Sequence, residues 1–150
     1  MSGGVIQKCV NYGKSETQWA PTGIAVSVTN VMISDCRNEG TIYGSGASGI
    51  AYNIGVGSIV KNCLNLGDLP TATTKSGICY TVKGTIKNCL SCCKIKNAIQ
   101  KQYYGTDFSA FYVKWKTGYI GLKALDSVGA YMFAIPNEEY LQERGFTKAG

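Results

Sequence analysis

Cysteine recurs along this chain at a nearly constant interval. The intervals are 27, 27 and 26 residues, and the four periodic residues are Cys9, Cys36, Cys63 and Cys89. An aliphatic residue lies three positions before each cysteine. In the first three units an asparagine lies two positions after it and a glycine four positions after it. These neighbours are Ile6, Ile33, Val60 and Ile86, then Asn11, Asn38 and Asn65, then Gly13, Gly40 and Gly67. Self-similarity at a fixed period predicts a stack of similar structural units.

Each unit has the pattern of short β-strands separated by turns. The segments Gly23–Thr29, Gly49–Gly55 and Gly77–Lys83 alternate large and small residues, which is typical of strands. The pattern alone leaves open whether the large or the small residues face the core. A unit of about 27 residues is too long for a left-handed hexapeptide coil. We therefore expect an all-β fold, a right-handed parallel β-helix of about four coils that start near residues 5, 32, 59 and 85 and span residues 1–97.

The repeated polar residues have a structural interpretation in such a stack. A buried asparagine amide can bond to the asparagine of the next coil, and a glycine shortly afterwards leaves room for the backbone. Free cysteine is a small, frequently buried residue, so the periodic cysteines are expected to fill one line of the core. The chain has seven cysteines and no histidine, which argues against a disulfide framework. Zinc at the Cys89-x-x-Cys92-Cys93 spacing is the alternative, and we expect neither a metal nor a cofactor.

The motif Ile-x-x-Cys-x-Asn-x-Gly-x-Ile at Ile33–Ile42, followed by Gly49-Ile-Ala51, resembles the GLUG-type and related β-helix repeats. A second copy runs from Val60 to Gly67, and the resemblance covers residues 5 to about 97. It implies a β-helix of the kind found in large surface proteins and adhesins of gut bacteria and anaerobic protists. Members of that family mainly supply long structural or adhesive shafts.

The last third of the chain differs in composition. Asparagine and glycine are lost after Cys89, and residues 98–150 are expected to form a C-terminal cap of strands with a short helix near 138–144. Asn137 is the predicted N-cap of that helix. The segments Phe111–Lys116 and Ala130–Ile135 have strand patterns. Phe111–Lys116 also interleaves rings and cations, as single-stranded nucleic-acid platforms do, but we favour an ordinary strand.

Charge suggests the nature of a partner. The net charge is +6, and residues 1–97 carry nine Lys/Arg against four Asp/Glu. A basic face can favour an acidic protein, filament or polymer, and nucleic acid is an alternative. The expected face comprises Lys61, Lys83, Lys87, Lys94, Lys96 and Lys101. The sequence shows neither a signal peptide nor a long apolar stretch. A cytoplasmic or cytoskeletal setting is therefore expected if the chain is full length, and the cell surface if it is a fragment.

Catalysis is not expected. There is no histidine for general-base chemistry, and the carboxylates Glu16, Asp35, Glu39 and Asp68 fall at different repeat positions. The sequence therefore predicts a non-enzymatic structural protein, a rigid β-solenoid scaffold or docking module in a larger protein or filament assembly. The alternatives are a fragment of a cell-surface adhesin and, in another class, a small carbohydrate-binding or polysaccharide-cleaving β-helix.

Overall fold

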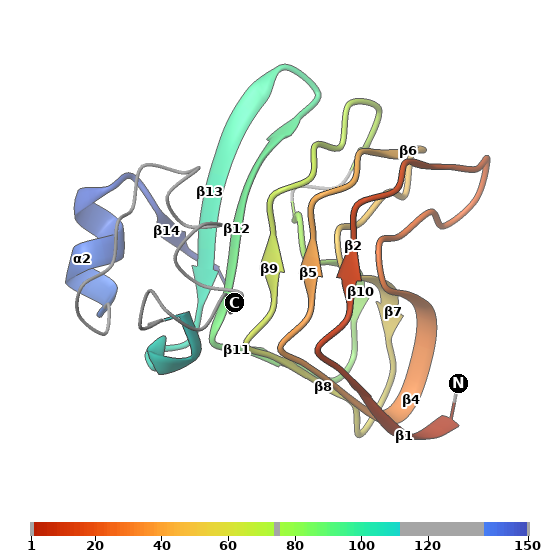
Figure 1. The fold of residues 1–150 in the computed structure, drawn as a ribbon, viewed down its shortest axis with the longest axis horizontal. Coiled ribbons are helices and arrows are strands. Elements are labelled where there is room, and N and C mark those ends of the chain that lie inside the picture. The colour runs from red at the N-terminus through yellow and green to blue at the C-terminus, as the bar shows by residue number, and fades with distance from the viewer. Residues whose placement is uncertain (1, 74–75, 112–136, 150) are drawn as a thin grey trace.

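The computed structural model describes residues 2–73, 76–111 and 137–149 and shows a β-solenoid of about three turns (Figure 1). The prediction of a parallel β-solenoid is confirmed, and its count of four corresponds to four stacked strands joined by about three full turns. The elements are β1 (Ser2–Gln7), β2 (Val10–Asn11), β3 (Ser15–Glu16), β4 (Ala25–Ser34), β5 (Arg37–Asn38), β6 (Ile42–Tyr43), β7 (Ala51–Ile54), β8 (Ile59–Lys61), β9 (Leu64–Asn65), β10 (Cys79–Val82), β11 (Thr85–Lys87), β12 (Cys89–Ile95), β13 (Ala98–Tyr104), the 3₁₀ helix η1 (Ser109–Phe111), α2 (Glu138–Glu143) and β14 (Thr147–Lys148).

Three sheets wind around the solenoid. The first contains β10-β7-β4-β8-β11 with β1 on β4, the second β14-β13-β12-β9-β5-β2, and the third β3-β6. Identical repeat positions pair in parallel, such as Ile6 with Ile33 and Ile33 with Val60. The repeat spacing of the sequence is therefore the register of the stack.

A left-handed backbone position turns the chain between the first and second sheets. It is the residue immediately before each periodic cysteine: Lys8 (φ 56°), Asp35 (φ 55°), Asn62 (φ 55°) and Asn88 (φ 55°). Asn and Asp tolerate this region better than most residues because their short side chains bond locally. The repeat pattern described above did not include this column, although an Asp or Asn before three of the four cysteines is its visible signal in the sequence.

The structure shows that neither set of alternating residues faces inward throughout. Ala51 and Cys79 of the small set are buried, and Ala25 packs against the same core. Ile50, Ile54 and Ile78 of the large set are also buried, whereas Tyr52 and Tyr80 lie between them and stack with ring centroids 4.9 Å apart. Small residues therefore fill the middle of this wall of the core, and aliphatic residues fill its ends.

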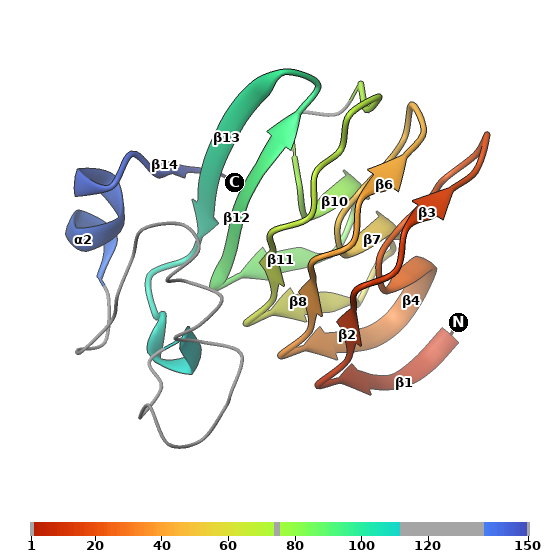
Figure 2. The same cartoon turned by 45° about the horizontal axis from the view of Figure 1, so that its top comes forward.

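The C-terminal end is covered by a different kind of pairing. Strand β13 runs antiparallel to β12, and β14 pairs with β13 (Figure 2). Helix α2 confirms the predicted short helix, and the Asn137 side chain accepts the Tyr140 N–H at 2.8 Å as its N-cap. A second apolar cluster joins this region to the solenoid: Leu64, Leu90, Tyr103, Phe108, Phe111, Leu141 and Phe146.

Two sequence predictions fall largely or wholly outside the described residues. Of Phe111–Lys116 only Phe111 is described, at the end of η1, and the expected strand Ala130–Ile135 lies outside entirely. Among the described residues, no helix has the length and apolar character required to cross a membrane.

Candidate interaction surfaces

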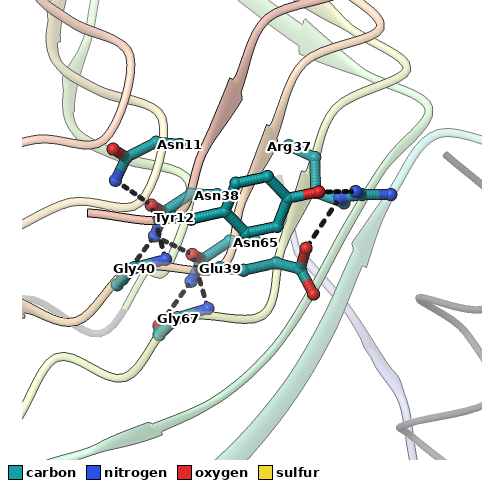
Figure 3. A network of polar contacts seen from close by, with 8 residues as sticks. All are labelled: Asn11, Tyr12, Arg37, Asn38, Glu39, Gly40, Asn65 and Gly67. Atoms are coloured by element: carbon teal, nitrogen blue, oxygen red, sulfur yellow. Dashed lines mark hydrogen bonds and ion pairs between the residues drawn. The ribbon is translucent and has the colours of Figure 1, made fainter. Parts of the chain in front are cut away.

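A line of asparagine carboxamides runs through the stack beneath the second sheet (Figure 3). Asn11 Nδ2 donates to Asn38 Oδ1 at 2.8 Å, and Asn38 Nδ2 donates to Asn65 Oδ1 at 2.9 Å. Each Nδ2 also donates to the carbonyl of the glycine two residues later, whose N–H donates to Oδ1. Asn38 therefore makes four hydrogen bonds with its side chain, which is the full capacity of a carboxamide.

Glycine is required where two coils approach this line. A Cβ at Gly40 would collide with the carbonyl oxygen of Gly13, and one at Gly67 would collide with that of Gly40. At Gly13, where no earlier coil is described, a Cβ would meet only Asn11 Oδ1, at 3.5 Å. The glycine requirement thus comes from the neighbouring coil, and the backbone at Gly40 and Gly67 does not need a positive φ.

The periodic cysteines form a second internal line. Cys36, Cys63 and Cys89 are buried, whereas Cys9 in the first coil is exposed. Each thiol donates to the carbonyl two residues before it at 3.3–3.4 Å. In the three later coils it also approaches a carbonyl of the preceding coil, as Cys63 does at Ile33 (3.8 Å). All seven cysteines lie in the described segments and are free thiols.

The buried thiols are poorly suited to nucleophilic chemistry. Burial raises the pKa of Cys63 and Cys79, and the neighbouring Cys63 thiol together with burial raises that of Cys36. Burial also raises the pKa of Cys93, to about 12. The reactive form of cysteine is the thiolate, so these residues are held in their unreactive form. Within the described ranges, no group of three or more His, Cys, Asp or Glu side chains is placed to hold a metal ion.

The six lysines expected to form a basic face come from several strands and from both large sheets. Lys61 and Lys87 are register partners on neighbouring strands β8 and β11. Lys83 follows β10, Lys94 belongs to β12 in the second sheet, and Lys96 follows that strand. Lys101 is engaged inside the cap: its Nζ donates to the Arg144 carbonyl at 3.1 Å and lies over the Phe146 ring. The column formed by Lys61 and Lys87 is therefore the part of the expected face that the fold brings together.

An open cavity of about 550 Å³ lies at the C-terminal edge of the first sheet. Its lining includes Ser76, Tyr80, Thr85 and Tyr104, and the Ser76 and Tyr104 hydroxyls are 2.9 Å apart. Tyr80 is 44% exposed while one face of its ring stacks on Tyr52. The repeat pattern did not predict this site, because the pairing of β13 with β12 has no signature in the repeat and, in the described part of the chain, β13 does not extend to β10.

Comparison of the chain with protein-family models, curated proteins and solved structures gives no match. The fold is that of a β-helix repeat protein, whereas membership of the GLUG-type family stays an expectation from the sequence motif.

Proposed function

We propose that this protein is a non-enzymatic β-solenoid scaffold, a rigid block that holds a partner protein within a larger assembly. The observation that carries the proposal is the line of hydrogen bonds that joins Asn11, Asn38 and Asn65 across three coils. The side chains that recur in the sequence join one coil to the next, and a buried polar group with all its hydrogen bonds made, as at Asn38, makes a structure rigid and specific. The residues that recur along this chain thus hold one coil of the solenoid against the next.

The partner surface that we propose is the column of Lys61 and Lys87. Like charges directly opposite each other on neighbouring strands destabilise a sheet. An acidic partner would remove that repulsion, and its approach would be steered by the positive charge of the repeats. An acidic protein or filament therefore fits this face.

Affinity purification from native lysate with mass spectrometry tests the scaffold and its face together. We expect a stoichiometric partner that is retained by the parent protein and lost by a Lys61→Glu, Lys87→Glu variant. The matched control is Lys83→Glu, Lys94→Glu, which changes the net charge equally at two exposed lysines outside the column. Equal retention by both variants would remove the column from the proposal, and a protein that purifies alone in every case would refute the scaffold.

The setting that we propose is an intracellular assembly, with a fragment of a surface adhesin as the alternative. Thiol titration of protein from its native source, denatured without reductant, separates the two. Seven reactive thiols are expected from a reducing compartment, because the chain contains seven cysteines. A shortfall that reductant restores would favour the surface.

A second candidate function is carbohydrate binding at the cavity beside Tyr80. An exposed aromatic face with a few hydroxyls around it is a composition that can take a small polar ligand such as a sugar ring. Titration with an oligosaccharide panel should shift the NMR signals of Tyr80 and Thr85, and Tyr80→Ala should abolish binding. Tyr12→Ala is the control, since that tyrosine is exposed in the first coil. Absence of any shift across the panel would reject this function.

A further inference from the structure

The periodic cysteines form one continuous line across four stacked coils. The residues two positions before and one position after each cysteine pair with their equivalents in the next coil. Cys9, Cys36, Cys63 and Cys89 therefore lie above one another, and neighbouring thiols of this cysteine line interact directly. Because adjacent strands are about 4.8 Å apart, the line contains three sulfur–sulfur spacings of about that length.

Backbone carbonyls hold each sulfur at the same place in its coil. Cys63 Sγ lies 3.3 Å from the Lys61 carbonyl oxygen and 3.8 Å from that of Ile33 in the preceding coil. Cys36 and Cys89 make the same two contacts, at 3.3 Å within the coil and at 3.9 and 3.7 Å to the preceding one. The sulfur positions are thus fixed by the fold and repeat with it.

The three spacings lie between coils that are hydrogen-bonded through the cysteines themselves. The carbonyls of Cys9, Cys36 and Cys63 each accept an N–H of the next coil, at 2.9, 2.9 and 3.0 Å. The geometry of the cysteine line therefore depends only on contacts between neighbouring coils. It is the same whatever lies beyond either end of the stack.

The surroundings of the line restrict the charge of anything that it binds. Cys36, Cys63 and Cys89 are fully buried in the apolar cluster that also contains Ile33 and Val60. A net charge in such a place is costly. A monovalent cation that takes the place of a thiol proton leaves the number of charges unchanged, whereas a divalent cation adds one. The line therefore suits a monovalent ion.

The sulfur–sulfur spacing restricts the coordination. A bond between a first-row metal and a thiolate is about 2.3 Å long, so a linear sulfur–metal–sulfur unit spans about 4.6 Å. This matches the spacing between coils. Thiolates select soft ions, and Cu(I) is the soft monovalent ion of the first row that accepts two ligands in a line. The expectation of no metal concerned zinc, which needs four ligands, and the described residues offer no such group.

We infer that the cysteine line is a Cu(I) site that takes three ions, one in each spacing between Cys9, Cys36, Cys63 and Cys89. Each Cu(I) forms bonds to the sulfurs of two adjacent coils and releases one thiol proton to solvent. Three of the four protons are replaced, copper remains Cu(I), and nothing is oxidised or reduced. The bound ions join the coils to one another, which goes beyond the proposed scaffold function and does not depend on its partner.

Refolding in the presence of copper tests the site, because the thiols are buried in the folded chain. The reduced, denatured chain is refolded without oxygen with the acetonitrile complex of Cu(I), then dialysed against a Cu(I) chelator. We expect three copper ions to remain per chain. X-ray absorption should show two sulfur neighbours for each copper, at about 2.3 Å. No retained copper, or a shell of three or four sulfurs, would overturn the inference.

Three variants separate the line from the other cysteines. Cys9→Ala removes one spacing and should lower the retained copper from three ions to two. Cys63→Ala removes two spacings and should lower it to one. Cys93→Ala is the matched control, since it removes a buried thiol outside the line and should retain three. Circular dichroism checks that each variant refolds. If Cys63→Ala does not, Cys9→Ala still decides, and equal retention in all versions would overturn the inference.

Stability gives a second readout. An ion that binds the folded chain more tightly than the unfolded one raises Tm. We expect a rise of about 5 °C for the copper-loaded parent protein and no rise for Cys63→Ala. The chelator should reverse the rise, which distinguishes copper from disulfides because the chelator leaves disulfides intact. An equal rise in Cys63→Ala would overturn the inference, whereas the partner experiment with Lys61 and Lys87 is unaffected by either result.

Discussion

Asn38 is the residue on which the coil stack depends most, because its carboxamide is buried and bonds to both neighbouring coils. Asn38→Ala would leave several buried donors and acceptors without partners. We expect the free energy of unfolding to fall by about 3 kcal/mol, measured by urea denaturation. The control is Asn11→Ala in the first coil, where solvent reaches the side chain and a loss of about 1 kcal/mol is expected. Equal losses would show that the line does not act as a network.

The glycines at matching repeat positions differ in what surrounds them. Gly40→Ala and Gly67→Ala force a methyl against the backbone of the preceding coil, which should lower the free energy of unfolding by about 2 kcal/mol or more. Gly13→Ala is the matched control, because only a van der Waals contact with Asn11 is created there. It should cost less than about 1 kcal/mol. Thermal unfolding of the three variants would reveal this contrast, and a severe effect at Gly13 would contradict it.

Ionisation of the cysteines makes the fold sensitive to alkaline pH. The pKa values of Cys36, Cys63 and Cys79 are raised in the folded state, from an ordinary 9.0. Above about pH 9 the unfolded chain loses these protons while the folded chain keeps them, so stability falls as pH rises. For each thiol, the free energy of unfolding should fall by up to about 1.4 kcal/mol per pH unit in this range. Well below pH 8 the raised pKa values should have no effect on stability. Urea unfolding between pH 8 and 10 should show the decline, with a shallower slope in Cys63→Ala. If the slope of stability against pH were the same in Cys63→Ala as in the parent protein, the raised pKa of Cys63 would be contradicted.

Helix α2 depends on a local cap at its beginning and on apolar packing along one side. Asn137 accepts the Tyr140 N–H, and Leu141 is buried among the aromatic residues of the cap. Asn137→Ala should destabilise the helix by about 1 kcal/mol, whereas Asn137→Asp retains an acceptor and should change little. Faster hydrogen exchange in residues 138–143 of the alanine variant alone would be the expected readout. Equal exchange in both variants would show that packing of Leu141 dominates.

Stability along the whole molecule should follow the position of each coil in the stack. Strands β5 and β9 pair on both sides, whereas β1, β2 and β3 pair on one side only in the described chain. Because each coil is stabilised mainly by its neighbours, the edge strands should open first. Hydrogen exchange monitored by NMR should show the slowest amides in β5 and β9 and the fastest in β1 to β3. The reverse order would contradict a nearest-neighbour stack.

The repeat pattern by itself determined the register of this protein. Pairing in a parallel stack joins residues one period apart, so intervals of 27, 27 and 26 predicted which strands lie side by side. The positions of Asn38 and Cys63 inside the stack followed from the same argument. The short helix near residue 138 was also predictable, because capping is a local property of the sequence.

Only the tertiary structure decided which side of each strand faces the core, because that depends on where the corner residues turn the chain. It separated Lys101 from Lys61 and Lys87, since β13 turns back along β12 rather than adding another parallel coil. Among the described residues it pairs β10 only with β7, and the cavity beside Tyr80 lies at that edge. These features arise from contacts between segments that share no repeat, and a periodic pattern carries no information about them.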